Sequence, residues 1–237
     1  MAESYEETRL KLVPPTWNPT PVTVAQILDD PKCSPDGRQP AFLMRGMLSP
    51  EESAYFIEEA TKLGMEDSGY PHHYRCCDRV SARADTGVAE ELWRRFIPYA
   101  FDFEDTQGCV WRPFKLNPVF RIVSYNENGH FAPHYDGGFR ESADVQSFLT
   151  FMLYLNDDFE GGATNFLRPH SQRVRDAESR LIASDTDVVS AVKPETGACV
   201  VFKHDAHFHE GQRLGPGAKK WIMRSEVMFR RLGADEK

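Results

Sequence analysis

Val119-Phe-Arg-Ile-Val-Ser-Tyr-Asn-Glu-Asn-Gly-His-Phe-Ala-Pro-His-Tyr-Asp136 combines a predicted strand with a candidate pair of metal ligands. Residues 119–125 alternate in character, so Arg121 and Tyr125 are expected on the same face of the strand. A short glycine-containing turn follows, in which His130 is expected to be solvated. The stretch ends in a His-x-Asp motif, which can bind a metal ion but is a weak signal on its own.

More short strands are expected C-terminal to this stretch. Residues 148–155 alternate between a face with Thr150 and Tyr154 and an opposite apolar face. Residues 199–202 and 220–229 are two further predicted strands, and glycine-rich turns separate the strands from one another.

Two amphipathic helices are expected before the strands. The first follows Ser49, which begins a Ser-x-x-Glu capping box with proline at the first helical position, and it ends at Gly64. The second is expected at residues 85–97 and ends at Pro98. Helices followed by short strands predict an α+β protein with a jelly-roll, cupin-like core (a double-stranded β-helix) and supporting N-terminal helices.

The chain is expected to hold one domain, residues 41–232, preceded by an extended arm. Residues 1–40 contain seven of the sixteen prolines, which favours an extended conformation with one short helix around residues 24–28.

Three polar segments interrupt the regular pattern. Residues 168–193 are long for a connection and lack a clear period, so they are expected to be a lid or an insertion loop. Residues 137–146 are a second candidate lid. Residues 75–83 are interpreted as a substrate-side loop in which no residue is assigned a role.

The charge and the cysteine pattern exclude several classes of function. Acidic residues outnumber basic ones 36 to 28 among 237 residues, giving a net charge of −8. This balance argues against nucleic acid or an anionic membrane as the main partner. No run of about 18 apolar residues is present to span a bilayer. Five cysteines without a Cys-x-x-Cys pair, and an N-terminus without a signal region, lead us to expect a reduced protein of the cytoplasm or nucleus.

A third metal ligand is expected from the histidines after the predicted strand 199–202. His204, His207 and His209 are all available there. Two histidines and one carboxylate on adjacent strands form a facial triad, which leaves three positions of an octahedral metal open. This donor set favours non-haem Fe(II) over zinc, which more often takes a tetrahedral site with cysteine ligands.

Five blocks of the chain resemble one family, in the order in which that family carries them. They are residues 121–136, Thr150-Phe-Met-Leu-Tyr-Leu-Asn156, Gly161-Gly-Ala-Thr-Asn-Phe166, Pro194-Glu-Thr-Gly-Ala-Cys-Val-Val-Phe202, and His209-Glu-Gly211 with Gly217-Ala-Lys-Lys-Trp221. The pattern resembles the prolyl-4-hydroxylase-like branch of the 2-oxoglutarate/Fe(II)-dependent dioxygenases. Because the resemblance covers about residues 42–231, residues 41–232 are expected to form the dioxygenase domain.

The resemblance implies that Fe(II) is bound by His134, Asp136 and His209. His209 is chosen because His-Glu-Gly is the form that this family has at the third ligand. His204 and His207 are then expected as exposed loop residues or as partners that orient a ligand.

The family also holds the distal carboxylate of 2-oxoglutarate with a basic residue, and the last predicted strand offers two. Lys220 directly precedes the tryptophan of the family pattern, although the loop after His209 is one residue longer than usual. Arg224 lies four residues further along the same face, so it can take this role or share it. The alternative for Arg224 is an ion pair with Glu226.

Other residues are expected around the co-substrate and the substrate. Tyr154 and Tyr125 are similar in position to family tyrosines that reach 2-oxoglutarate, and a buried hydroxyl needs such a partner. Thr150 and Thr164 are weaker candidates, because β-branched residues are common in strands. Arg121 is expected either to meet a substrate carboxylate or to lie at the strand edge in solvent.

The resemblance implies an enzyme that uses Fe(II), O2 and 2-oxoglutarate to hydroxylate an aliphatic C–H, releasing succinate and CO2, with ascorbate as a candidate reductant. The intact Asp136 favours hydroxylation over halogenation, because family members that halogenate lack this carboxylate. The substrate is expected to be a prolyl-type protein residue or a small metabolite. Two other functions stay open: a non-catalytic jelly-roll binding module and an oxygen-independent cupin-type metalloenzyme.

Overall fold

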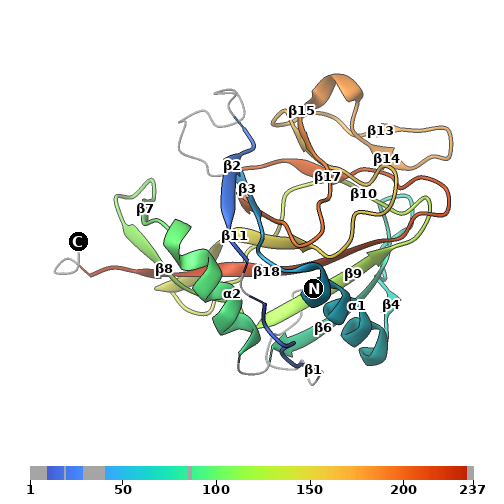
Figure 1. Cartoon of the computed structure of the whole chain (residues 1–237). Coiled ribbons are helices and arrows are strands. Elements are labelled where there is room, and N and C mark those ends of the chain that lie inside the picture. The colour runs from blue at the N-terminus through green and yellow to red at the C-terminus, as the bar shows by residue number, and fades with distance from the viewer. Residues whose placement is uncertain (1–9, 19, 29–40, 85–86, 234–237) are drawn as a thin grey trace.

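Two β-sheets packed face to face form the body of the protein (Figure 1). The computed structural model describes residues 10–18, 20–28, 41–84 and 87–233. Over these residues the large sheet has eleven strands, the small sheet has five, and a separate hairpin has two. The predicted α+β jelly-roll architecture is confirmed, because the strands form two stacked layers and the helices precede most of them.

The large sheet runs in the order β1-β6-β9-β18-β11-β16-β3-β2, with β4 paired to β6, β7 to β8, and β8 to β18. The small sheet runs in the order β15-β12-β17-β10-β5, and β13 pairs with β14. The strands are β1 (Lys11–Leu12), β2 (Thr23–Gln26), β3 (Ala41–Arg45), β4 (Glu66–Asp67), β5 (Arg75–Cys76), β6 (Asp78–Ala84), β7 (Phe103–Glu104), β8 (Val110–Leu116), β9 (Val119–Tyr125), β10 (His130–His134), β11 (Val145–Tyr154), β12 (Thr164–Leu167), β13 (Val174–Arg175), β14 (Leu181–Ile182), β15 (Val188–Val192), β16 (Cys199–Lys203), β17 (His209–Gly211) and β18 (Lys220–Arg231).

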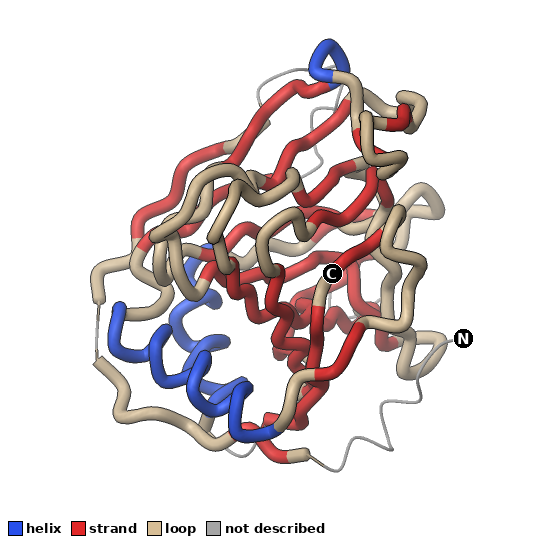
Figure 2. Tube along the Cα trace, turned by 90° about the vertical axis from the view of Figure 1, so that its right-hand side faces the viewer, coloured by secondary structure: helices blue, strands red, loops and turns tan. Residues whose placement is uncertain are grey.

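The two faces of the large sheet have different partners. Helices α1 (Pro50–Leu63) and α2 (Val88–Phe96) lie together on one side of the molecule, as Figure 2 shows. Phe96 of α2 packs edge-on against Phe151 of β11, within the apolar cluster that the helices share with this face. Met152 and Ile222 belong to the cluster that the opposite face forms with the small sheet. The predicted alternation of β11 and β18 therefore separates a helix-packed face from a cavity-lining face.

The first helix begins as its sequence predicts. The Ser49 side chain accepts a hydrogen bond from the amide of Glu52 at 3.1 Å, and the Glu52 carboxylate accepts one from the amide of Ser49 at 2.9 Å. This is the expected capping box. The buried Glu52 also pairs with Arg95 of α2 at 2.7 and 2.9 Å, which joins the two helices through a buried ion pair.

The second helix is shorter than predicted. It begins at Val88 after Gly87, whose φ of 110° suits a residue without a side chain, and residues 85–86 lie outside the described residues. Pro98 lies within a 3₁₀ turn, Ile97–Tyr99, rather than directly after the helix. Neither described helix has the length and the apolar content that crossing a membrane requires.

The described part of the predicted arm forms strands at the two ends of the large sheet. β1 pairs in parallel with β6, and β2 pairs with β3. The expected short helix at residues 24–28 is wrong, because Thr23–Gln26 is extended. Its β-branched Thr23 and Val24 suit the open edge that β3 presents, and the sequence alone does not reveal that edge. Much of residues 1–40 lies outside the described residues.

Two of the segments interpreted as loops contain strands. Residues 168–193 hold the β13–β14 hairpin, a 3₁₀ turn (Asp185–Asp187) and β15. This segment packs on the strand before the metal centre, since Arg173 Nε donates to the carbonyl of Pro133 at 2.7 Å. Its movement as a lid stays a prediction. Residues 75–83 form most of β5 and β6.

Candidate metal centre and co-substrate cavity

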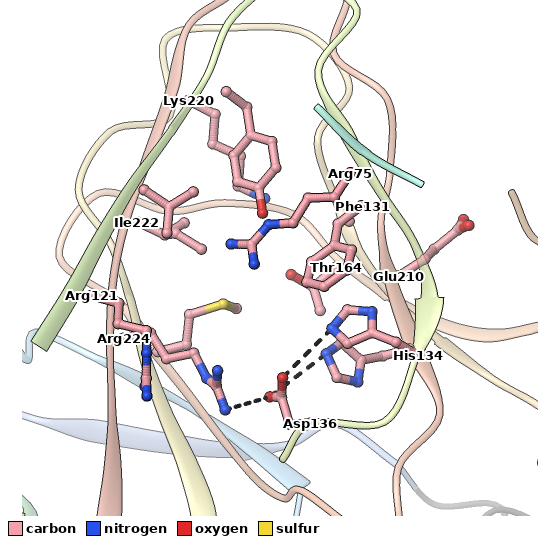
Figure 3. A pocket seen from close by; sticks show the side chains of 15 residues that line it. Arg75, Arg121, Phe131, His134, Asp136, Thr164, Glu210, Lys220, Ile222 and Arg224 are labelled. Carbon is pink, nitrogen blue, oxygen red and sulfur yellow. Dashed lines mark ion pairs between the residues drawn. The ribbon is translucent and has the colours of Figure 1, made fainter. Parts of the chain in front are cut away.

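The three predicted ligands converge between the two sheets (Figure 3). Strands β10 and β17 pair in a register that places His134 opposite His209, and Asp136 follows two residues after β10. Nε2 of His134 lies 3.5 Å from Oδ1 of Asp136, and Nε2 of His209 lies 3.8 Å from Oδ2 of the same carboxylate. All the donor atoms lie within 4.8 Å of one another, so one metal ion can contact all three.

Backbone carbonyls orient both imidazoles. Nδ1 of His134 lies 2.8 Å from the carbonyl oxygen of Ala132, and Nδ1 of His209 lies 3.0 Å from that of His207. A carbonyl only accepts hydrogen bonds, so each Nδ1 carries a proton and each Nε2 is the ring nitrogen left to face a metal ion. Burial first, and the neighbouring His134 second, lower the pKa of His209 to about 3, which keeps this imidazole neutral and able to bind a metal.

Asp136 is held as an anion. Burial alone would raise its pKa, but the charge of Arg224, followed by His209 and His134, holds the pKa well below its usual range. Nη2 of Arg224 lies 3.3 Å from Oδ2 of Asp136. The hydroxyl of Thr150 donates to the same oxygen at 2.7 Å. Two imidazoles and one carboxylate are the donor set of a non-haem Fe(II) centre.

Lys220 is a buried cation at the inner end of the cavity. Its ammonium donates to the carbonyl of Gly162 at 2.6 Å and lies near the rings of Tyr125 and Tyr154. No carboxylate among the described residues pairs with it, and burial lowers its pKa to about 7. An anionic carboxylate brought into this cavity would therefore compensate the buried charge.

The predicted face of the last strand is confirmed, and it separates the two candidate anchors. Lys220, Ile222 and Arg224 all line the cavity. Arg224 sits against Asp136 and lies 3.8 Å from Glu226, whereas Glu226 has a closer partner in Arg121 at 2.7 Å. Lys220 is thus the residue better placed for the distal carboxylate of a co-substrate.

Of the predicted tyrosines and threonines, Tyr125 and Thr164 line the cavity. Burial raises the pKa of the Tyr125 hydroxyl. The hydroxyl of Tyr154 donates to Thr164 Oγ1 at 2.7 Å, so these two residues form a pair beside Lys220. The Thr150 hydroxyl donates its hydrogen bond to Asp136 at the metal centre, not to a group at the inner end of the cavity.

Three histidines differ from expectation. His130 is 1% exposed rather than solvated, because β10 lies between β17 and β5 and the side chain is covered. His204 and His207 are 4% and 3% exposed, so an exposed loop position is wrong for both. The backbone carbonyl of His207 accepts the hydrogen bond from Nδ1 of His209, and a role for its side chain stays a prediction.

Arg75 lines the cavity, although no role was expected for it. It belongs to β5, which pairs with β10 so that Arg75 lies opposite Phe131. Its guanidinium lies 4.4 Å from the centre of the Phe131 ring, and that ring stacks on His134 at 3.6 Å. A two-residue strand has no recognisable period, so only the pairing of distant segments reveals this residue.

Residues 120–225 match the family model described as the 2OG-Fe(II) oxygenase superfamily, and this segment contains His134, Asp136, His209 and Lys220. This segment belongs to the 2OG-Fe(II) oxygenase superfamily. The oxygenase therefore takes Fe(II) and 2-oxoglutarate, and the residues present fit both. The triad supplies the donors for the metal, and Lys220 supplies a buried cation without a carboxylate partner among the described residues.

Solved structures share the fold of the oxygenase. A Pseudomonas putida prolyl-4-hydroxylase has a TM-score of 0.51 and 16% sequence identity, covering 85% of this chain and 97% of that chain. The 2OG complex of a viral collagen prolyl hydroxylase from Paramecium Bursaria Chlorella virus-1 has a TM-score of 0.49 and 17% identity, covering 80% and 96%. A search of curated proteins found no match. At 16% identity, the similarity to the Pseudomonas putida enzyme supports the fold alone.

Thr150→Val in the oxygenase is expected to weaken Fe(II) binding by about 10- to 100-fold, because the hydrogen bond that orients Asp136 is lost while the shape is kept. The measurement is an anaerobic Fe(II) titration in the presence of 2-oxoglutarate. Thr61→Val on the exposed side of α1 is the matched control and should bind as the wild type does. Equal affinities for Thr150→Val and the wild type would contradict the role of this hydroxyl.

Proposed function

We propose that this oxygenase hydroxylates an aliphatic C–H of a prolyl-type protein residue or of a small metabolite. The observation that carries the proposal is the complete triad, in which Asp136 occupies the third protein position beside His134 and His209. With Fe(II) and 2-oxoglutarate bound, O2 would supply one oxygen atom to the succinate formed with release of CO2 and the other to the hydroxylated C–H.

The residues of the chain hold and orient the reactants. We assign Lys220 to the distal carboxylate of 2-oxoglutarate, with Tyr125 and the Tyr154–Thr164 pair beside it. These groups are buried, so they bind the co-substrate where water is excluded and electrostatic attraction is strong. Arg224 holds Asp136 in its anionic form, which keeps the metal site ready to bind a cation.

The purified protein with Fe(II) and 2-oxoglutarate is expected to show a charge-transfer absorbance without oxygen, and to release succinate with O2 and a substrate. Turnover is measured as succinate release against a peptide library and a metabolite extract, with the hydroxylated product identified by mass spectrometry. A jelly-roll binding module would give neither the absorbance nor succinate, and an oxygen-independent enzyme would act without O2. A response to one metabolite and to no peptide would exclude the protein-residue substrate.

A further inference from the structure

A second, wider cavity of about 390 Å³ lies beside the metal centre. His134 and Asp136 line both this outer cavity and the inner one that contains Lys220. The outer cavity reaches the surface at Tyr70 and Tyr135, which are 44% and 39% exposed. A substrate whose C–H must approach the metal would therefore lie in the outer cavity, with the co-substrate in the inner one.

The outer cavity is rich in positive charge, although the net charge of the chain is −8. Among the described residues, four arginines and two carboxylates line it. One carboxylate belongs to the triad and the other is bound by an arginine of the same lining at 2.7 Å. A concave surface of one sign attracts ligands of the opposite sign. These lining residues are Arg75, Arg79, Arg121, Arg224, Asp136 and Glu226.

Arg75 differs from the other arginines in its surroundings. Its Nε donates to Sγ of Cys77 at 3.1 Å, and its guanidinium lies over the rings of Phe131 and Tyr70. No carboxylate among the described residues pairs with it. Figure 3 shows this guanidinium pointing into the cavity. Because this half-buried guanidinium has no carboxylate beside it among the described residues, an anionic ligand would pair with its charge.

The position of Arg75 separates its role from that of Lys220. Lys220 lines only the inner cavity, whereas Arg75 lies where the inner and outer cavities meet. The Phe131 ring supports one face of the guanidinium, and Nε is engaged by Cys77, so the Nη groups beside the Tyr125 hydroxyl are the donors that a ligand would meet. A planar carboxylate matches these donors.

We propose that the substrate of this oxygenase carries a carboxylate, which the guanidinium of Arg75 binds while the C–H to be hydroxylated lies at the metal centre. The inference rests on the proposed hydroxylation, since it names the substrate class of the same site. The lining as a whole carries four arginines against two carboxylates, so it favours the approach of an anion. Tyr70 and Tyr135 provide ring surfaces for the rest of the substrate.

The test measures binding to the full chain loaded with Fe(II) and 2-oxoglutarate under anaerobic conditions, by calorimetry. The probes are 3-phenylpropanoate and N-acetyl-L-proline, each with its uncharged amide, together with 2-phenylethyl phosphate. The acids are expected to bind at least about tenfold more tightly than their amides. This ratio is expected to fall to near one in Arg75→Gln and to be partly retained in Arg75→Lys, which keeps the charge. Arg94→Gln, on the exposed side of α2, is the matched control and should keep the wild-type ratio.

Each other outcome overturns the inference. Acids that bind no better than amides, or no binding by any probe, would mean that the cavity does not select carboxylates. Tighter binding of the phosphate would exclude the carboxylate in favour of a phosphate ester. A loss of 2-oxoglutarate affinity in Arg75→Gln as large as that in Lys220→Met would assign Arg75 to the co-substrate. Absence of the 2-oxoglutarate charge-transfer absorbance in the wild type would instead show that the proposed function itself is wrong.

Discussion

Replacing His209 by alanine is expected to lower the rate of succinate formation by more than about a hundredfold, because changes to residues that only orient a ligand already cost about 10- to 100-fold. The variant leaves His134 and Asp136 as the two remaining ligands of the candidate triad. Fe(II) binding is expected to weaken together with turnover. The measurement compares bound Fe(II) and succinate release in the variant and the wild type at equal Fe(II) and 2-oxoglutarate concentrations.

Replacing His209 rather than Asp136 separates the loss of a metal ligand from a folding defect. Removing Asp136 would leave Arg224 without the carboxylate that lies 3.3 Å from it, so a folding defect could be mistaken for the loss of a ligand. His72→Ala is the matched control, because His72 is exposed and its ion pair with Asp67 lies at the surface. A His209→Ala protein with wild-type unfolding temperature and wild-type Fe(II) binding would show that this histidine is not a ligand.

Local signals in the sequence predict the parts of the fold that local physics decides. The capping box at Ser49 and Glu52 sets the start of α1, and the structure contains both of its hydrogen bonds. The alternation of β11 and β18 decides which side chains face the cavity, since successive side chains point to opposite faces. The His-x-Asp motif identifies His134 and Asp136 as candidate ligands. The resemblance to the family identifies His209, among three nearby histidines, as the third.

Pairing between distant segments decides what the sequence does not show. His130 is buried because β5 and β17 flank β10, and neither neighbour is adjacent in sequence. Arg75 reaches the cavity only because the short β5 pairs with β10 at Phe131. The strand Thr23–Gln26 forms because the edge of β3 is free to accept it. In each case the local pattern is too short or too polar to reveal the contact.

The distribution of charge links the fold to the chemistry. The surface of an acidic chain repels anions, yet the cavity between its sheets holds Lys220, Arg75 and Arg224. Each of these cations has a different neighbour: a backbone carbonyl, an aromatic ring and the Asp136 carboxylate, respectively. Arg224 already has the Asp136 carboxylate beside it. Lys220 and Arg75 are therefore the cations with which the carboxylates of ligands would pair.

Lys220→Met is expected to raise the KM for 2-oxoglutarate by about 30- to 4000-fold, since removing one partner of a buried charge pair costs about 2–5 kcal/mol. Arg224→Met is expected to raise this KM by less than about tenfold and to weaken Fe(II) binding instead, because Arg224 contacts Asp136. Lys219→Met is the matched control, since Lys219 is exposed and its ammonium lies over the Trp221 ring. A larger effect on KM in Arg224→Met than in Lys220→Met would make Arg224 the anchor.

The pH dependence of the KM for 2-oxoglutarate tests whether the charge of Lys220 binds the co-substrate. Burial lowers the pKa of Lys220 to about 7, so above that pH the free enzyme holds mainly the neutral amine. Binding of the carboxylate needs the ammonium, and one proton must then be taken up with 2-oxoglutarate. Titration of Lys220 is therefore expected to leave the wild-type KM for 2-oxoglutarate unchanged below pH 7. Above pH 7 it is expected to raise this KM by up to about tenfold per pH unit. The rise in KM should be absent in Lys220→Met and present in Lys219→Met. A wild-type KM that stays constant from pH 7 to about 9 would contradict a neutral Lys220 in the free enzyme.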